Sequence, residues 1–307
     1  MWRALAFVIC ALPAQAQTAD PMRIADCLQT DRALEAVADR AFARKGNIRL
    51  DAEGWCLAEN VSLDVDSNVT LEVASLRWRV SGMDRALQGL PPTALSIMAE
   101  GVRSAPQTGD PVIDYLMDLQ QSTGNITATF DAGWSAESLV LRLNRAEIRF
   151  SEDDHIALRG LVTDIDLSDE SKIYTSLGQA RLTDLTVDIE TNGMFENYFA
   201  MALGTLLLHG AEDPEAEVEN LKAQALQVVS DLPEANFDAA SIAALRQILR
   251  DMPRPRGFLR VRLQSGDGLG SLRFFALGNA IRGAGVDGLW PLLPDLSVAV
   301  SYPDQPE

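Results

Sequence analysis

The chain has 307 residues, of which 47% are hydrophobic, and its formal net charge at pH 7 is −18. This composition is typical of a folded globular protein with enough apolar side chains for a core. The strong negative charge speaks against nucleic acid as a partner, because nucleic-acid binding depends on neutralising phosphates with cations. We therefore expect a globular protein with no nucleic-acid partner.

The first sixteen residues have the pattern of a secretory signal peptide. Arg3 supplies the positive start, Leu5–Leu12 form a short apolar run, and Ala14-Gln15-Ala16 is a small-residue cleavage site. The run is too short to cross a bilayer, which takes roughly 20 apolar residues. We expect cleavage before Gln17, export to a bacterial periplasm, and no transmembrane segment in the mature chain.

Cleavage at that point would change the cysteine count. Cys10 would leave with the signal peptide, and Cys27 and Cys56 would remain. An even pair of cysteines in an oxidising compartment predicts a disulfide between them, and two buried free thiols are the alternative.

The pattern of hydrophobic residues changes along the chain. Residues 21–44 have helical spacing and predict an amphipathic helix or a pair of helices, ended by Gly46. After this the period becomes two and stays so through most of the chain as far as Ile189, which indicates a long antiparallel meander with one dry face and one wet face. We expect turns at Asp66-Ser67-Asn68 and Asp131-Ala132-Gly133, and a bulge at Ala74-Ser75.

Helical spacing returns in two places. A short helix is predicted over Val112–Leu119, and a three-helix block over Met194–Leu208, Asp213–Ser230 and Asp238–Asp251, with Asp238 as an N-cap. Strands follow at residues 259–263 and 296–300. The expected fold is α+β: a long curved antiparallel sheet with an N-terminal helix and a C-terminal three-helix block covering its apolar face. Residues 17–307 are expected to form a single domain, with a division near residue 191 as the alternative.

The sequence has few residues or motifs that are typical of a catalytic or metal-binding site. His155 lies in an acidic turn and His209 at a helix end, where a solvated side chain is the simplest interpretation. Gly266–Gly270 lacks the lysine of a phosphate loop, and Asp64–Asn68 and Asp164–Ser168 lack the glycine and glutamate of a calcium loop. We expect no cofactor, no metal and no catalysis; the alternative is a hydrolase that uses carboxylates no motif reveals.

One group of basic residues stands out in this acidic chain. It is a cluster of arginines near the end of the chain, of which Arg260 and Arg262 share the strand face opposite the apolar residues. Arginine binds phosphate through two parallel hydrogen bonds, so the cluster is a candidate site for an anionic headgroup or lipid phosphate. The four candidate residues are Arg254, Arg256, Arg260 and Arg262. The alternative is that these arginines neutralise nearby acids.

The one-faced strands, such as Val69–Val80 and Leu139–Phe150, together with the signal peptide and closing helices, resemble exported envelope proteins of the AsmA-like kind. The resemblance covers residues 47–190 and 257–302, and it implies an elongated sheet whose concave apolar side is associated with lipid handling and envelope maintenance. The chain departs from that group in its shorter length and in the expected absence of an N-terminal membrane anchor.

From these features we expect a non-catalytic periplasmic envelope protein that binds a lipid or other hydrophobic small molecule on the concave face of its sheet. Envelope proteins are further candidate partners. The alternative is a structural or protein-interaction module whose helices fill that face completely.

Overall fold

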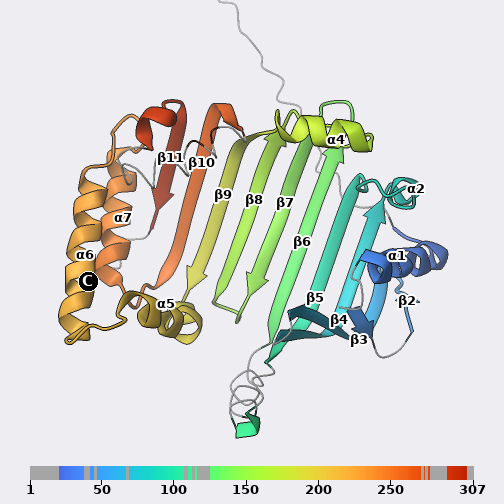
Figure 1. The fold of residues 1–307 in the computed structure, drawn as a ribbon, viewed down its shortest axis with the longest axis horizontal. Coiled ribbons are helices and arrows are strands. Elements are labelled where there is room, and N and C mark those ends of the chain that lie inside the picture. The colour runs from blue at the N-terminus through green and yellow to red at the C-terminus, as the bar shows by residue number, and fades with distance from the viewer. Residues whose placement is uncertain are drawn as a thin grey trace, which may run out of the picture.

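The fold is described from a computed structural model, which places residues 21–37, 42–44, 47–66, 69–106, 110–112, 115, 125–270, 273, 276 and 289–302. It is an α+β fold built on one 11-stranded sheet with helices around it (Figure 1). The predicted signal peptide, Met1–Ala16, and most of the helix predicted over Val112–Leu119 lie outside the described residues.

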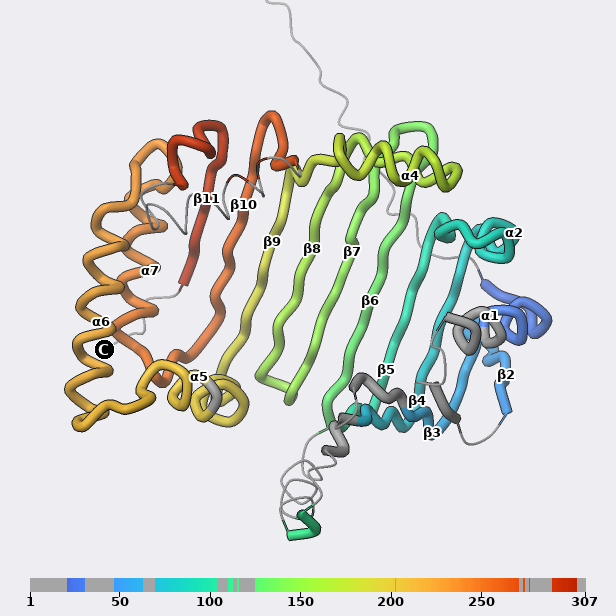
Figure 2. Tube along the Cα trace, viewed as in Figure 1, coloured from blue at the N-terminus to red at the C-terminus, as the bar shows by residue number. Residues whose placement is uncertain are grey.

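The sheet is a meander in which consecutive strands are antiparallel neighbours, as predicted (Figure 2). Its main path is β1 (Phe42–Arg44), β3 (Cys56–Asp66), β4 (Val69–Ser81), β5 (Ala94–Pro106), β6 (Ile126–Ser135), β7 (Val140–Arg149), β8 (His155–Thr163), β9 (Arg181–Thr191), β10 (Gly257–Gly270) and β11 (Leu296–Ser301). The short strand β2 (Arg49–Leu50) also pairs with β3. Because β10 pairs with β9, the sheet continues across residue 191, where the sequence allowed a division.

The sheet has one apolar face and one polar face. Trp78 of β4 pairs with Ile97 of β5, and Ile97 pairs with Phe130 of β6. Directly paired residues share a face, so this row of three lies on the apolar side. Val187 and Val261 continue the same face on β9 and β10. The residues between these positions point to the other face, where most charged side chains lie.

An irregularity at Ala74 extends across three strands. Leu76 packs in the same apolar cluster as Val73, although strict alternation would put the two on opposite faces. Asn60 and Gly101, the residues opposite Ala74 on the neighbouring strands, have left-handed φ values of 52° and 64°. A Cβ at Gly101 would lie 2.7 Å from that of Ala74, which requires glycine there. The bulge predicted in β4 is therefore wrong: its side chains change face, but its register with β3 and β5 does not shift at Ala74. The register shift lies at Gly101 instead, where β5 pairs with β6.

The N-terminal helix α1 (Ile24–Val37) lies at one end of the sheet. Its Cys27 forms the predicted disulfide with Cys56, the first residue of β3, and both residues are fully buried. They join Met22 and Trp78 in the apolar cluster at this end. The helix is shorter than predicted, because residues 42–44 form β1 and pair with the edge of β3 instead.

The other helices lie around the sheet. They are α2 (Met83–Ala86), α4 (Glu170–Leu177), the π-helical turn η1 (Phe195–Phe199), α5 (Ala200–Leu207), α6 (Pro214–Ser230), α7 (Ala239–Asp251) and the 3-10 turn η3 (Trp290–Leu292). As predicted, Asp238 caps α7 by accepting a 2.7 Å hydrogen bond from the Ser241 backbone N–H. Ala244 and Ile248 of α7 cluster with Val298 of β11. The helices thus cover the apolar face at its two ends.

The turn predicted at Asp131-Ala132-Gly133 is wrong, since β6 runs through these residues and the turn follows at residues 136–139. The side chain of Asp131 instead accepts a 2.6 Å hydrogen bond from the Ser96 hydroxyl on β5 and another from the Asn144 amide on β7. The register shifts beside it, between Asp131 and Ala132, so the polar residue marks an irregularity within the sheet.

Candidate functional site

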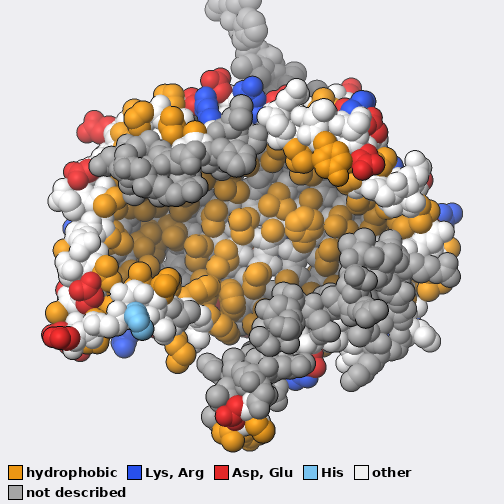
Figure 3. All heavy atoms as spheres, viewed as in Figure 1, with side chains coloured by type: hydrophobic (Ala, Val, Ile, Leu, Met, Phe, Trp, Pro, Cys, Tyr) orange, Lys and Arg blue, Asp and Glu red, His pale blue; other side chains and the backbone are white. Residues whose placement is uncertain are grey.

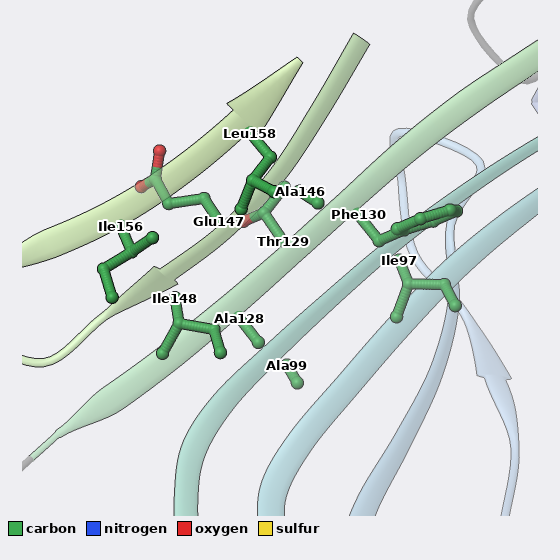
Figure 4. Close-up of a pocket in the computed structure, with 10 residues that line it drawn as sticks. All are labelled: Ile97, Ala99, Ala128, Thr129, Phe130, Ala146, Glu147, Ile148, Ile156 and Leu158. Atoms are coloured by element: carbon green, nitrogen blue, oxygen red, sulfur yellow. The ribbon is translucent and has the colours of Figure 1, made fainter. Parts of the chain in front are cut away.

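A hollow lies in the middle of the apolar face, between the ends that the helices cover. Figure 3 shows this region as a continuous hydrophobic surface framed by the surrounding elements. The hollow has a volume of about 250 Å³ and crosses strands β5 to β8. Figure 4 shows the residues that line it, of which the apolar ones are Ile97, Ala99, Ala128, Phe130, Ala146, Ile148, Ile156 and Leu158. We call this site the apolar hollow.

The strand register places small residues at the bottom of the apolar hollow. Ala99 of β5 pairs with Ala128 of β6, and Ala128 pairs with Ile148 of β7. In the neighbouring row, Phe130 of β6 pairs with Ala146 of β7. Because alanine side chains end at Cβ, neighbouring alanines leave a depression between larger residues. The sequence of these strands therefore builds the hollow directly.

The lining is apolar and open to solvent. Ile148 is 47% exposed, although the residues paired with it on both sides are also apolar. Glu147 and Thr129 also border the hollow, but they alternate with its lining residues along the strands, and Glu147 makes its ion pairs on the opposite face. A patch of this kind offers contact to hydrocarbon and no hydrogen-bonding side chain.

The opposite face is lined by ion pairs between neighbouring strands. Asp188 of β9 lies between Arg159 of β8, at 2.5 Å, and Arg260 of β10, at 2.6 Å. Burial raises the pKa of Asp188, but hydrogen bonds from Arg260 and Arg159 outweigh burial and hold this pKa below its usual value. A second group lies within β7, where Glu147 pairs with Arg145 and Arg149. Burial raises the pKa of Glu147, but hydrogen bonds from these arginines outweigh burial and lower this pKa.

The four arginines predicted as a headgroup site do not line the apolar hollow. Arg260 pairs with Asp188 on the polar face, and Arg262 pairs with Asp184 at 2.8 Å. Arg256 holds Glu196 of η1 through both carboxylate oxygens. Arg254 is exposed in the segment before β10. The observed ion pairs favour the alternative interpretation, in which these arginines neutralise nearby acids.

Two comparisons with known proteins return nothing. No protein-family model matches the chain. No curated protein matches it at a significant level either. The argument for a function therefore depends on the geometry of the chain itself.

The candidate chemical residues are dispersed. Nδ1 of His155 lies 3.2 Å from Glu190 on the polar face, and His209 is exposed beyond the end of α5. Asp166 accepts a hydrogen bond from the Ser168 backbone N–H and faces Lys172 at 3.5 Å. Within the described part of the chain, no group of three or more His, Cys, Asp or Glu side chains is placed to hold a metal ion. No described helix is both long and apolar enough to cross a membrane.

Sequence reasoning gave the face of the site but not its residues. Alternation placed Ile148 and Ile156 on the apolar side, yet it gave no reason to separate them from the other apolar residues of the meander. The signal that could have found the hollow is the series Ala99, Ala128 and Ala146 on three successive strands. Reading it requires the register between strands, which the sequence does not state.

Proposed function

We propose that this chain is an exported bacterial envelope protein that binds a lipid or another hydrophobic ligand in the apolar hollow of its sheet. The observation that carries the proposal is the open hydrocarbon surface across β5 to β8, with Ile148 at 47% exposure in a hollow that is lined mainly by apolar side chains. Exposed contiguous apolar surface on a folded chain is a mark of binding, because leaving it in water costs free energy.

The size and chemistry of the hollow suit one part of such a ligand. Its volume of about 250 Å³ is below the roughly 300–1,000 Å³ of sites that enclose a whole small molecule. A segment of an acyl chain lying across the strands fits this space, while the polar end of the ligand extends beyond it. The ion pairs on the opposite face are separated from this ligand by the sheet itself.

Export is part of the same proposal. The buried Cys27–Cys56 disulfide is typical of a protein that folds in an oxidising compartment. The Arg3 start, the apolar run after it and the Ala14-Gln15-Ala16 site support a cleaved signal peptide and a periplasmic location. Together with the one-faced meander, these features keep the resemblance to AsmA-like envelope proteins as our working family hypothesis.

Solvent extraction and native mass spectrometry of the chain purified without detergent test the proposal. We expect a co-purifying lipid or a bound fatty-acid probe. Ile148→Glu places a charge against the ligand and should abolish this binding, since a carboxylate in contact with hydrocarbon is strongly disfavoured. Leu177→Glu is the matched control, because Leu177 on α4 is similarly exposed, at 51%, and lies outside the hollow.

The proposal fails if the parent chain carries no lipid and takes up no probe. It also fails if Ile148→Glu and Leu177→Glu bind the probe equally well, because the ligand would then lie elsewhere. A lost signal in both variants, with both still folded by circular dichroism, would likewise remove the hollow as the site.

A further inference from the structure

The helix α5 exposes apolar side chains at the edge of the sheet. Its sequence is Ala-Met-Ala-Leu-Gly-Thr-Leu-Leu, and no charged residue occurs from Asn197 through Leu208. Met201 is 85% exposed, Leu206 74% and Leu207 55%. These values are high for residues of this kind, which are usually buried in a folded protein.

The exposed residues of α5 do not form a single stripe. Successive residues turn by about 100° around a helix axis, so Met201 and Leu206 point about 140° apart. A helix that docks into a protein groove presents one row of apolar residues at i, i+3, i+4 and i+7 spacing. A helix that is apolar on several sides suits an apolar medium that surrounds it. Lipid is such a medium.

The length of α5 fixes how it can meet lipid. Eight residues give a helix of about 12 Å, far short of the roughly 30 Å of a bilayer core. The helix can therefore lie within the boundary between headgroups and acyl chains but cannot cross. Tyr198, just before α5, has an aromatic ring and a hydroxyl, a combination enriched at membrane–water boundaries.

The turn η1, which leads directly into α5, is joined to the apolar hollow by aromatic contacts. Phe150, in the turn after β7, contacts Tyr198 in a tilted arrangement at 4.6 Å and Phe199 edge-on at 6.3 Å between ring centroids. Ile148, two residues before Phe150 on the same strand face, lines the hollow. Figure 1 shows α5 at the edge of the sheet beside the ends of β8 and β9. An apolar path therefore runs from the hollow to α5.

We propose that α5 inserts into the surface of a zwitterionic bilayer and brings the open end of the apolar hollow to the membrane. Exposed acids follow α5 closely, at Glu212, Asp213 and Glu215. These carboxylates repel anionic headgroups, so the surface that fits is a neutral one. The insertion stands on α5 alone, whereas lipid transfer through the path rests on the proposed function.

Flotation of the purified chain with vesicles tests the insertion. We expect binding to phosphatidylcholine vesicles and weaker binding when phosphatidylglycerol is added. Leu206→Asp should reduce vesicle binding about tenfold or more, because it removes one leucine side chain that would be buried in the bilayer. Leu87→Asp is the matched control: Leu87 is 57% exposed, follows α2 at the other end of the sheet, and undergoes the same change in charge. Its binding should equal that of the parent.

The two proposals fail separately. Ile148→Glu should lose the acyl-chain probe and keep vesicle binding, whereas Leu206→Asp should keep the probe in solution and lose the vesicles. The insertion is overturned if the parent does not float with phosphatidylcholine, or if Leu206→Asp floats as well as the parent. It is also overturned if sedimentation shows a dimer that Leu206→Asp dissociates while vesicle binding stays absent, because α5 would then contact a second copy.

Discussion

Reduction of the Cys27–Cys56 disulfide is the perturbation whose cost follows most directly from the structure. Both residues are fully buried, and the bond joins α1 to the first residue of β3. Of the α1 side chains from Ile24 to Thr30, only Cys27 is buried, while Ile24 and Leu28 are exposed. Within residues 24–30, the disulfide is therefore the main buried link between the helix and the sheet.

The expected size comes from chain entropy. The bond closes a loop with a sequence separation of 29. In the loop-closure treatment, a loop of this length restricts the unfolded chain enough to stabilise the folded state by about 3.6 kcal/mol at 25 °C. With a urea dependence of about 2–3 kcal/mol/M, the unfolding midpoint should fall by between about 1 and 2 M on reduction.

Urea unfolding with and without dithiothreitol measures this difference on the same chain, so the contribution of packing is almost unchanged. Cys27→Ala/Cys56→Ala should lose somewhat more, because it also removes two buried sulfur atoms. A midpoint that moves by less than about 0.3 M would refute the chain-entropy argument. Two alkylatable thiols in the native chain, purified without reductant, would refute the disulfide itself.

Two further predictions concern carboxylates. Asp188→Asn leaves two arginines facing each other without their shared carboxylate. The free energy of unfolding, measured with urea, should fall by about 1–3 kcal/mol and recover in part at high salt, which screens the repulsion. An unchanged unfolding midpoint would contradict this prediction. A hydrogen bond from the Ser265 hydroxyl is the main cause that lowers the pKa of Asp295 to about 2. Since this pKa is below the value in the unfolded chain, the stabilisation is present above about pH 4 and is lost as the pH falls towards 2. The melting temperature of Asp295→Asn should therefore fall less than that of the parent between about pH 4 and pH 2. An equal fall in both proteins would contradict this prediction.

Local patterns predicted the elements of this fold well. Alternation revealed the meander, and Asp238 was recognised as a cap because its side chain can reach the N–H three residues later. The errors occurred where a residue typical of a turn serves another purpose. Asp131 was read as turn chemistry, yet its carboxylate holds neighbouring strands together through Ser96 and Asn144. Those partners lie 35 and 13 residues away in the chain, so no local pattern reveals them.

The candidate site shows a similar limit. The arginines at 260 and 262 were conspicuous because they are basic residues in an acidic chain, but Asp184 and Asp188 on the neighbouring strand accept their hydrogen bonds. The alanines at the bottom of the hollow were inconspicuous, because a small apolar residue reads as ordinary core. Charge is visible in a sequence, whereas the absence of a covering side chain depends on three-dimensional packing.

The edge of the sheet at β11 bears on where the proposed ligand binds. At β11, the Val298 N–H donates to the Asn236 carbonyl at 2.8 Å, and the Val300 N–H donates to the Ser241 hydroxyl at 2.9 Å. These donors would otherwise pair with an added strand, and their engagement protects this edge. Binding by strand addition is therefore disfavoured at β11. The apolar hollow has no comparable partner for Ile148, so the free energy available for binding lies in hydrocarbon contact on the face of the sheet.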